Sequence, residues 1–199
     1  MPVLPQALTT LAAVKEYLGI TDNNSDDLLE SLIDNFTELI ENLMGGRRIK
    51  ETAFVDEEHD GGEQDVFAFN LPIKTSPALT ASFRTGTLAA PVFQDFTVED
   101  FIVYPDGGFI HFFGKTPGGS RNIRISYTAG FDPIPLDIDL LIKEMIAKEF
   151  NRRKSLGILR ERVEGTEIEY ANTQTQQAIT PTQQATIDKY TRYNVGQNL

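Results

Sequence analysis

Two long segments of the chain place apolar residues at every third or fourth position, the spacing of one face of a helix. The first runs from Ser25 to Gly45, and its apolar positions are Leu28, Leu29, Leu32, Ile33, Phe36, Leu39, Ile40 and Leu43. Ser25 is predicted to cap this helix, with two aspartates in its first turn, and Gly45 and Gly46 end it. A shorter helix over residues 9–18, stopped by Gly19, precedes it.

The second segment begins near Pro135, a residue that suits the first turn of a helix, and continues to about Lys154. Its apolar positions are Ile138, Leu141, Ile142, Met145, Ile146 and Phe150. A broad apolar face has to be covered, and each of the two long helices is the obvious partner of the other. We therefore predict one small helical bundle with a core that includes Leu32, Phe36, Ile40, Ile142, Met145 and Ile146.

Between these helices the pattern changes to the period of two that is typical of strands. In residues 67–71 the larger side chains alternate with smaller or polar ones, with Phe67, Phe69 and Leu71 set against Ala68 and Asn70. Residues 101–104 and 109–113 flank a Pro-Asp-Gly-Gly turn and predict a hairpin, and residues 123–127 form a further strand. The pattern as a whole predicts about five to seven short strands.

The predicted fold class is α+β, with two N-terminal helices and a late helix in a bundle that is interrupted by a β-rich insertion. The expected domains are a helical core of residues 1–46 with 131–155, the insertion 47–130, and a C-terminal arm 156–199. At 199 residues the chain is long enough to bury a proper core in one domain or in two small ones.

The C-terminal arm is an extended tail that ends in a short helix. Residues 167–170 are compatible with a strand, and a polar stretch rich in Asn, Thr and Gln follows. The sequence Thr-Pro-Thr-Gln at 180–183 is a capping box with proline at the first helical position. The helix would carry Ile187, Tyr190 and Tyr193. It is interpreted either as an exposed docking element or as a helix that packs back on its own domain.

The net charge of −11 disfavours tight wrapping of DNA or binding to an anionic membrane. Basic residues cluster after the late helix, at Arg152, Arg153, Lys154, Arg160 and Arg162. Either they match the negative end of the helix dipole, or they form an interface. The absence of cysteine excludes disulfides and thiolate metal sites and fits a reducing compartment. No apolar run approaches bilayer length and the start lacks a basic signal region, so a cytosolic protein is expected.

No catalytic residue, metal site or cofactor is predicted. Gly114-Lys115-Thr116 lacks the spacing and the following helix of a phosphate loop. The acidic run 56–61 resembles the start of a calcium loop, but Phe67 stands where a bidentate Glu is needed, so a solvated acidic loop is expected. His59 and His111 are isolated, and neither a serine elbow nor a His-Glu-x-x-His pair occurs.

With these elements in place, the chain resembles the head–tail connector proteins, the adaptor family of long-tailed phages. Residues 11–19, 25–45 and the Arg-Arg pair at 47–48 are similar to the opening of that family, "LxxVKxYLGI" followed by "DxLLxxLIxxAxxxIExxxGRR". The segment from Ile125 through Phe131, Ile134 and Pro135 into the late helix resembles "VxVxYxAGYxxIPxDLxxAIxxxxxxxY". Weaker similarities are Asn70-Leu71-Pro72 with Pro77, Glu164–Tyr170, and Ile187–Tyr193. The β-rich middle is longer than the minimal family pattern, and Thr191 stands where arginine is usual.

The resemblance implies a non-enzymatic structural protein of the virion neck that is made in the host cytoplasm. Such a subunit forms a ring, commonly of twelve copies, that joins the portal to the tail and lines the DNA channel. Its partners would be the portal protein, neighbouring adaptor subunits and a downstream tail or stopper protein, with DNA only as passing channel content and no membrane. The candidate portal or subunit interface comprises Arg152, Arg153, Lys154, Arg160, Arg162, Ile187, Tyr190 and Tyr193.

Two other classes of function stay open at this point. A carbohydrate- or surface-binding module could be built on the β insertion, with Phe109, Phe112 and Phe113 as a stacking platform, although aromatic residues on a hairpin are more often core. A hydrolase with a pair of carboxylates is the third class, and nothing in the sequence selects such a pair.

Overall fold

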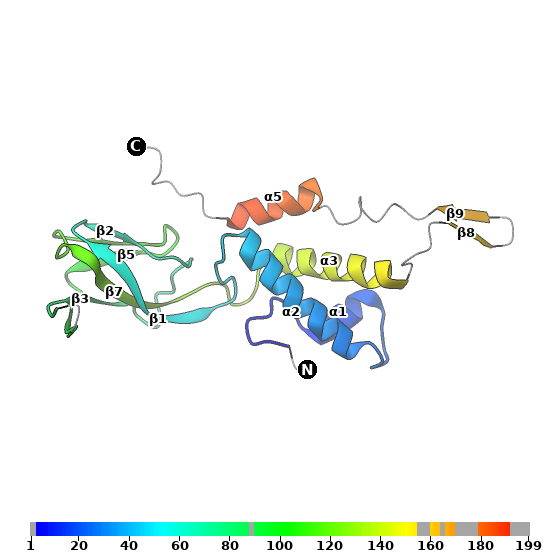
Figure 1. The fold of residues 1–199 in the computed structure, drawn as a ribbon, viewed down its shortest axis with the longest axis horizontal. Helices are drawn as coiled ribbons and strands as arrows, with labels where there is room; N and C mark the ends of the chain where they lie inside the picture. The colour runs from blue at the N-terminus through cyan, green and yellow to red at the C-terminus, as the bar shows by residue number, and fades with distance from the viewer. Residues whose placement is uncertain (1–2, 88–89, 155–159, 164–165, 170–178, 192–199) are drawn as a thin grey trace. The chain divides into compact units, whose positions relative to one another are not determined.

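The computed structural model describes residues 3–87, 90–154, 160–163, 166–169 and 179–191. The chain divides into two compact units, one formed by Met1–Gly46 with Ile134–Leu199 and the other by Arg47–Pro133 (Figure 1). The described residues contain four helices and two antiparallel sheets, besides a separate two-stranded hairpin, so the predicted α+β class is confirmed. No described helix combines the length and the apolarity that crossing a membrane requires.

The helical unit opens with α1, Leu11–Leu18, and α2, Asp26–Leu43. The Thr10 side chain caps α1 by accepting a hydrogen bond from the Ala13 N–H at 3.2 Å, and Gly19 ends the helix in the left-handed conformation at φ 67°. Ser25 occupies the N-cap position of α2, but its side chain makes no capping hydrogen bond there. The prediction of a Ser25 side-chain cap is therefore wrong, and the two aspartates of the first turn supply the favourable charge instead.

The third helix, α3, spans Leu136–Lys154 and packs against α2 and α1, so the predicted bundle is present. Its buried residues and those of α2 include five of the six core positions predicted for the bundle, Leu32, Ile40, Ile142, Met145 and Ile146. The sixth, Phe36, is only half-buried. The adjacent Thr37 takes the inward position, with 2% of its surface exposed, because its hydroxyl accepts a hydrogen bond from the Leu8 N–H of the segment that precedes α1.

The β unit contains two antiparallel sheets. The four-stranded sheet has the order β1-β7-β3-β4, with bounds Thr52–Gly61, Gly119–Ala129, Thr80–Arg84 and Phe93–Asp95. The three-stranded sheet has the order β2-β6-β5, with bounds Asp65–Phe67, Phe109–Phe112 and Phe101–Tyr104. The predicted hairpin is β5 paired with β6, and the strand predicted over residues 123–127 lies within the longer strand β7.

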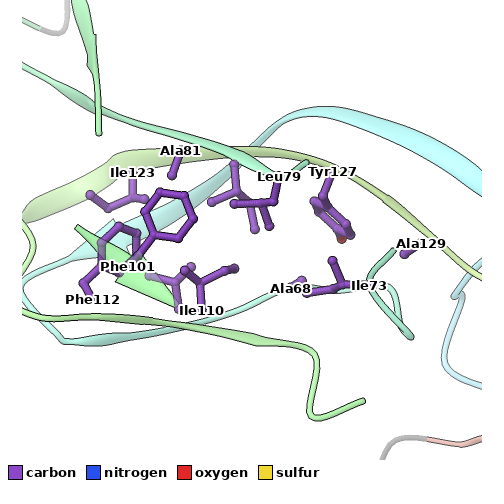
Figure 2. Packing of buried hydrophobic residues seen from close by; sticks show 12 residues of the cluster. Ala68, Ile73, Leu79, Ala81, Phe101, Ile110, Phe112, Ile123, Tyr127 and Ala129 are labelled. Carbon is purple, nitrogen blue, oxygen red and sulfur yellow. The ribbon is translucent and has the colours of Figure 1, made fainter. Parts of the chain in front are cut away.

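Both sheets contribute side chains to a single hydrophobic core in this unit (Figure 2). Ile110 and Phe112 of β6 lie in the same cluster as Ile123 and Ile125 of β7, and each of these side chains is at least 98% buried. Phe96 lies against Phe112 with a ring-centroid distance of 4.7 Å, which brings a connecting segment into the cluster. Burial of these apolar side chains is the main contribution to the stability of the β unit.

Two local predictions in the β unit are wrong. Of the alternating stretch 67–71, only Phe67 lies in a strand, because β2 spans Asp65–Phe67. Phe67 and Phe69 are each 53% exposed, whereas Val66 and Ala68 are buried. The acidic run 56–61 belongs to strand β1 and is not a solvated loop.

The C-terminal part contains a two-stranded hairpin, β8 and β9, and the helix α5. The hairpin pairs Arg160–Val163 with Thr166–Glu169. Helix α5 spans Pro181–Tyr190 and has the predicted capping box, in which the Thr180 hydroxyl accepts from the Gln183 N–H at 3.2 Å. The Gln183 side-chain oxygen accepts in return from the Thr180 N–H at 3.1 Å.

Candidate interaction surfaces

Helix α5 packs on the N-terminal half of α3 within the same chain. Its Ile187 side chain is buried, with 1% of its surface exposed. The Tyr190 hydroxyl lies 2.8 and 3.0 Å from the two Asp137 carboxylate oxygens, and the Lys189 ammonium donates to the same carboxylate at 2.7 Å. Further along, the Gln183 amide donates to the Glu144 carboxylate at 3.4 Å. The two helices are therefore antiparallel, and we call this surface of α3 the α5 seat.

The Asp137 carboxylate is the electrostatic centre of this seat. Partial burial would raise its pKa, but hydrogen bonds from Lys189 and Tyr190 outweigh that effect and lower it. The pKa of Tyr190 is raised, first by partial burial and then by the bond to Asp137, so its hydroxyl remains a donor. The negative charge also lies in the first turn of α3, where the helix dipole favours it.

These contacts correct one expectation about the C-terminal helix. Ile187 is buried against its own chain and Tyr190 is half-buried, so they are not exposed docking side chains in this conformation. Tyr193 lies outside the described residues. The structure therefore shows the second interpretation of the sequence, a helix that packs back on its own domain.

The basic residues at the C-terminal end of α3 are engaged within their own helix as far as their side chains are described. The Arg152 guanidinium forms a two-point pair with Glu149, with both distances at 2.8 Å, and Arg153 Nε lies 3.3 Å from the same carboxylate. The bond from Arg152 is the main reason that the pKa of Glu149 is lowered. The side chains of Lys154, Arg160 and Arg162 lie outside the described part, although Arg160 and Arg162 have their backbone in β8.

Exposed leucines form a second feature of the helical unit. Leu136 and Leu140 are one turn apart on α3 and are 85% and 47% exposed. Leu39 and Leu43 have the same spacing on α2 and are 41% and 39% exposed. The spacing of apolar residues in the sequence places Leu39 and Leu43 on the buried face of the helix, because their positions fit the edge of the apolar stripe. All four are therefore apolar side chains on the surface of the helical unit.

The outer face of the β2-β6-β5 sheet carries a row of aromatic side chains. Phe67, Phe109 and Tyr104 are paired across the three strands. Tyr104 and Phe109 stack at 4.5 Å with an interplanar angle of 11°, and Phe67 lies 5.6 Å from Phe109. The next outward row contains Ile102, which is 46% exposed, and the Asp65–His111 pair at 2.6 Å. We call this surface the aromatic face.

The geometry of the aromatic face bears on sugar binding. Because Tyr104 and Phe109 stack on one another, the ring faces between them are turned toward each other and covered. A stacking platform for a sugar or a base needs an open ring face. Of the three phenylalanines proposed for such a platform, Phe112 is buried, Phe109 is half-buried and Phe113 is 64% exposed.

The acidic residues of β1 are paired with basic groups of β7. The Glu58 carboxylate forms salt bridges with the guanidinium groups of Arg121 and Arg124. The Asp60 carboxylate accepts a hydrogen bond from the Arg121 backbone N–H at 2.7 Å. These bonds are the first causes of the lowered pKa values of Glu58 and Asp60. Among the residues that the structure describes, no cluster of three or more metal-ligating side chains occurs. These ion pairs and hydrogen bonds are therefore interpreted as contacts that hold β1 against β7.

The segment Gly114-Lys115-Thr116 is a structural connection. The Thr116 hydroxyl accepts from the Gly62 N–H at 2.9 Å and donates to the Glu63 carbonyl at 2.8 Å, and Thr116 is 4% exposed. A phosphate-binding role would require this hydroxyl to face an open loop at the start of a helix. Here it closes the connection between β1 and β2.

Comparison with known proteins identifies a family. The model of the head completion protein family matches residues 7–193. Among solved structures, the chain is similar to one from the neck of an empty GTA particle computed with C6 symmetry, with a TM-score of 0.60 and 16% identity. The similarity covers 98% of this chain and 95% of that one, and at this identity it supports a shared fold. None of the curated proteins matches the chain.

Proposed function

The chain belongs to the head completion protein family, and from that premise we propose that it is a ring subunit connecting the portal to the tail in the neck of a phage-like particle. The observation that carries the proposal is the family match over residues 7–193, which includes both compact units. The likeness of fold to a neck protein of a GTA particle supports the same location.

The net negative charge of the chain supports the proposal that it lines a channel through which DNA passes without binding. The sequence has 29 acidic residues against 18 basic ones. A protein that makes few phosphate contacts releases few counterions and so gains little affinity for DNA. We propose that the ring lines the channel through which the genome travels, with DNA as its content and not as a bound partner.

The proposed partners are the portal protein on one side, a tail or stopper protein on the other, and neighbouring copies of the chain. Leu136 and Leu140, with Leu39 and Leu43, are apolar surface available for such contacts. The basic residues Arg152, Arg153, Lys154, Arg160 and Arg162 remain proposed interface residues, as do Ile187, Tyr190 and Tyr193. Small contacts repeated around a ring, commonly of twelve copies in the connector family, would add up to firm attachment.

We further propose that the protein has no catalytic centre. The polar clusters described above tie strands or helices together, and their geometry explains them without a substrate. A screen against glycoside, ester, phosphate and peptide substrates should give no turnover above background. A reproducible activity that is lost on mutating a single Asp or Glu would overturn this proposal.

The exposed aromatic face is the one observation that favours a second candidate, a carbohydrate-binding module on the β unit. The family match points to the neck protein, which makes this candidate the weaker one. A glycan array probed with the full chain and with Tyr104→Ala distinguishes the two. Binding to a defined glycan that the variant loses would favour the module, and absence of binding by the full chain would leave the neck protein.

Loss of the gene tests the proposed function in the particle itself. Inactivating it in the virus that encodes the chain should yield packaged heads without attached tails, because the connection between portal and tail is missing. Supplying the wild-type chain from a plasmid should restore tailed particles. Tailed, infectious particles formed without the chain would overturn the proposal.

A further inference from the structure

Helix α5 and its seat on α3 form a small, self-contained contact. The helix has ten residues, a complete capping box and proline at its start, so its boundaries do not depend on the seat. One aliphatic side chain, Ile187, is fully buried, and polar pairs around Asp137 and Glu144 add to the contact. A helix of this length is marginal in water and needs a seat to be stable.

The connection between α3 and α5 is much longer than the distance along α3 requires. Gln183 contacts Glu144, which lies ten residues before the end of α3 at Lys154, or about 15 Å along the helix axis. The connection comprises residues 155–180, of which residues 160–169 span the β8–β9 hairpin. The sixteen residues outside the hairpin (155–159 and 170–180) can span up to about 50 Å. About five extended residues span 15 Å, so a connection within the usual range of two to eight residues would be enough to reach the seat on the same chain.

A long connection has two consequences for where the helix binds. It lowers the effective concentration of α5 at the seat of its own chain, since that concentration falls with the length of the connection. It also allows the helix to reach the equivalent seat on an adjacent copy. The contacts would be the same in both cases, so the two arrangements differ little in energy until copies are held side by side.

We propose that in the assembled ring each α5 leaves its own α3 and occupies the α5 seat of the neighbouring subunit. The inference rests on the proposed ring, and it names the occupant of the seat as the C-terminal helix of a second copy. Around a closed ring every subunit gives one helix and receives one, so no seat stays empty and no apolar surface is newly exposed. The exchanged helix would tie each subunit to the next.

The absence of cysteine in the chain makes cross-linking across the seat unambiguous. One variant carries Glu144→Cys and a second carries Gln183→Cys, at positions whose side chains are in contact. The two are mixed in equal amounts, assembled into rings on the portal protein, and treated with a short bismaleimide. A second pair, Asp137→Cys with Lys189→Cys, samples the other end of the seat. Melting temperatures close to wild type show that each variant folds.

Exchange predicts a covalent dimer in the assembled mixture that holds about half of the chains when the reaction is complete, since half of the neighbours carry the second variant. The double variant Glu144→Cys/Gln183→Cys should give a ladder of multimers in rings. The matched control replaces Gln183→Cys with Gln184→Cys, at an exposed position of the same helix, and should give much less dimer. Rings in which the double variant cross-links only within single chains would overturn the exchange. Failure to form rings would instead count against the proposed function.

Discussion

Gly130 is a position of the β unit that requires glycine both for its backbone conformation and for the space around it. It has φ +109°, and an added Cβ would lie 2.7 Å from the carbonyl atoms of Lys50 and 2.8 Å from the Ile49 oxygen. Its N–H donates to the Pro72 carbonyl at 3.0 Å, which fixes the local path of the chain. The conformation is one that L side chains rarely adopt, and the approach of the two segments is too close for any side chain.

Replacing Gly130 by alanine should therefore lower the free energy of unfolding by about 2 kcal/mol or more, through strain and a backbone clash together. Gly114→Ala is the matched control, since no atom lies within 4 Å of its added Cβ, and it should change the value by less than about 0.5 kcal/mol. Urea denaturation followed by circular dichroism measures both. Equal effects of the two substitutions would contradict the close approach at Gly130.

Glu57 joins three segments of the β unit through one carboxylate. It accepts from the Tyr127 hydroxyl at 2.6 Å and from the Phe69 N–H at 2.9 Å, and it pairs with the His59 ring at 2.8 Å. Burial alone would raise the pKa of Glu57, but these hydrogen bonds outweigh burial and lower it. The pKa of Tyr127 is raised, first by burial and then by the bond to Glu57, so its hydroxyl stays a donor.

The lowered pKa of Glu57 makes a prediction about acid stability. The unfolded chain titrates this carboxyl near 4.5, so its contribution is fully present above that pH and is lost as the pH falls through the lower pKa of the folded state. Glu57→Gln should cost about 1–3 kcal/mol at pH 7 and should lose less further stability than wild type on acidification. Urea denaturation at several values from pH 7 to pH 3 measures this. The control Glu99→Gln, at an exposed position, should show the same dependence of the free energy of unfolding on pH as wild type. If Glu57→Gln also shows the wild-type dependence, ionised Glu57 does not contribute to stability as stated.

At the scale of secondary-structure elements, α2 separates side chains that hold the bundle from side chains that face outward. Ile40 is fully buried, whereas the adjacent Leu39 is 41% exposed. Ile40→Ala should lower the free energy of unfolding by about 2–5 kcal/mol, because a cavity replaces a packed side chain. Leu39→Ala, on the same helix and with a side chain of the same size, should cost less than about 1 kcal/mol. Similar losses for both variants would show that the bundle packs on another face.

The elements that sequence predicts well are those whose signal is local. Helices α2 and α3 follow from long apolar periodicity, α5 from its capping box, and the β5–β6 hairpin from its turn. The alternation over residues 67–71 overlaps β2 only at Phe67, since a period of two also occurs by chance in the irregular segment that follows the strand. The acidic strand β1 was misread because its partners, Arg121 and Arg124, lie more than 60 residues away in sequence. The α5 seat could not be predicted for the same reason, because Asp137 and Tyr190 are 53 residues apart in the sequence.

At the scale of the whole molecule, two compact units of different architecture belong to one family match. The sequence motifs that indicated the family lie at the opening of the chain and at the junction from β7 into α3, where local geometry fixes glycine and proline. The surfaces proposed for assembly could not be read in the same way. Whether Leu136 or Leu140 faces a core or a partner depends on packing that is decided far along the chain.

The central claim is that copies of the chain assemble on the portal, and negative-stain microscopy of the purified protein mixed with its portal protein tests it most directly. The account predicts class averages in which an additional ring, coaxial with the portal, extends its tail-facing end, together with co-sedimentation of the two proteins. The portal alone and the chain alone are the controls. Portal particles unchanged by an excess of folded chain would contradict the account.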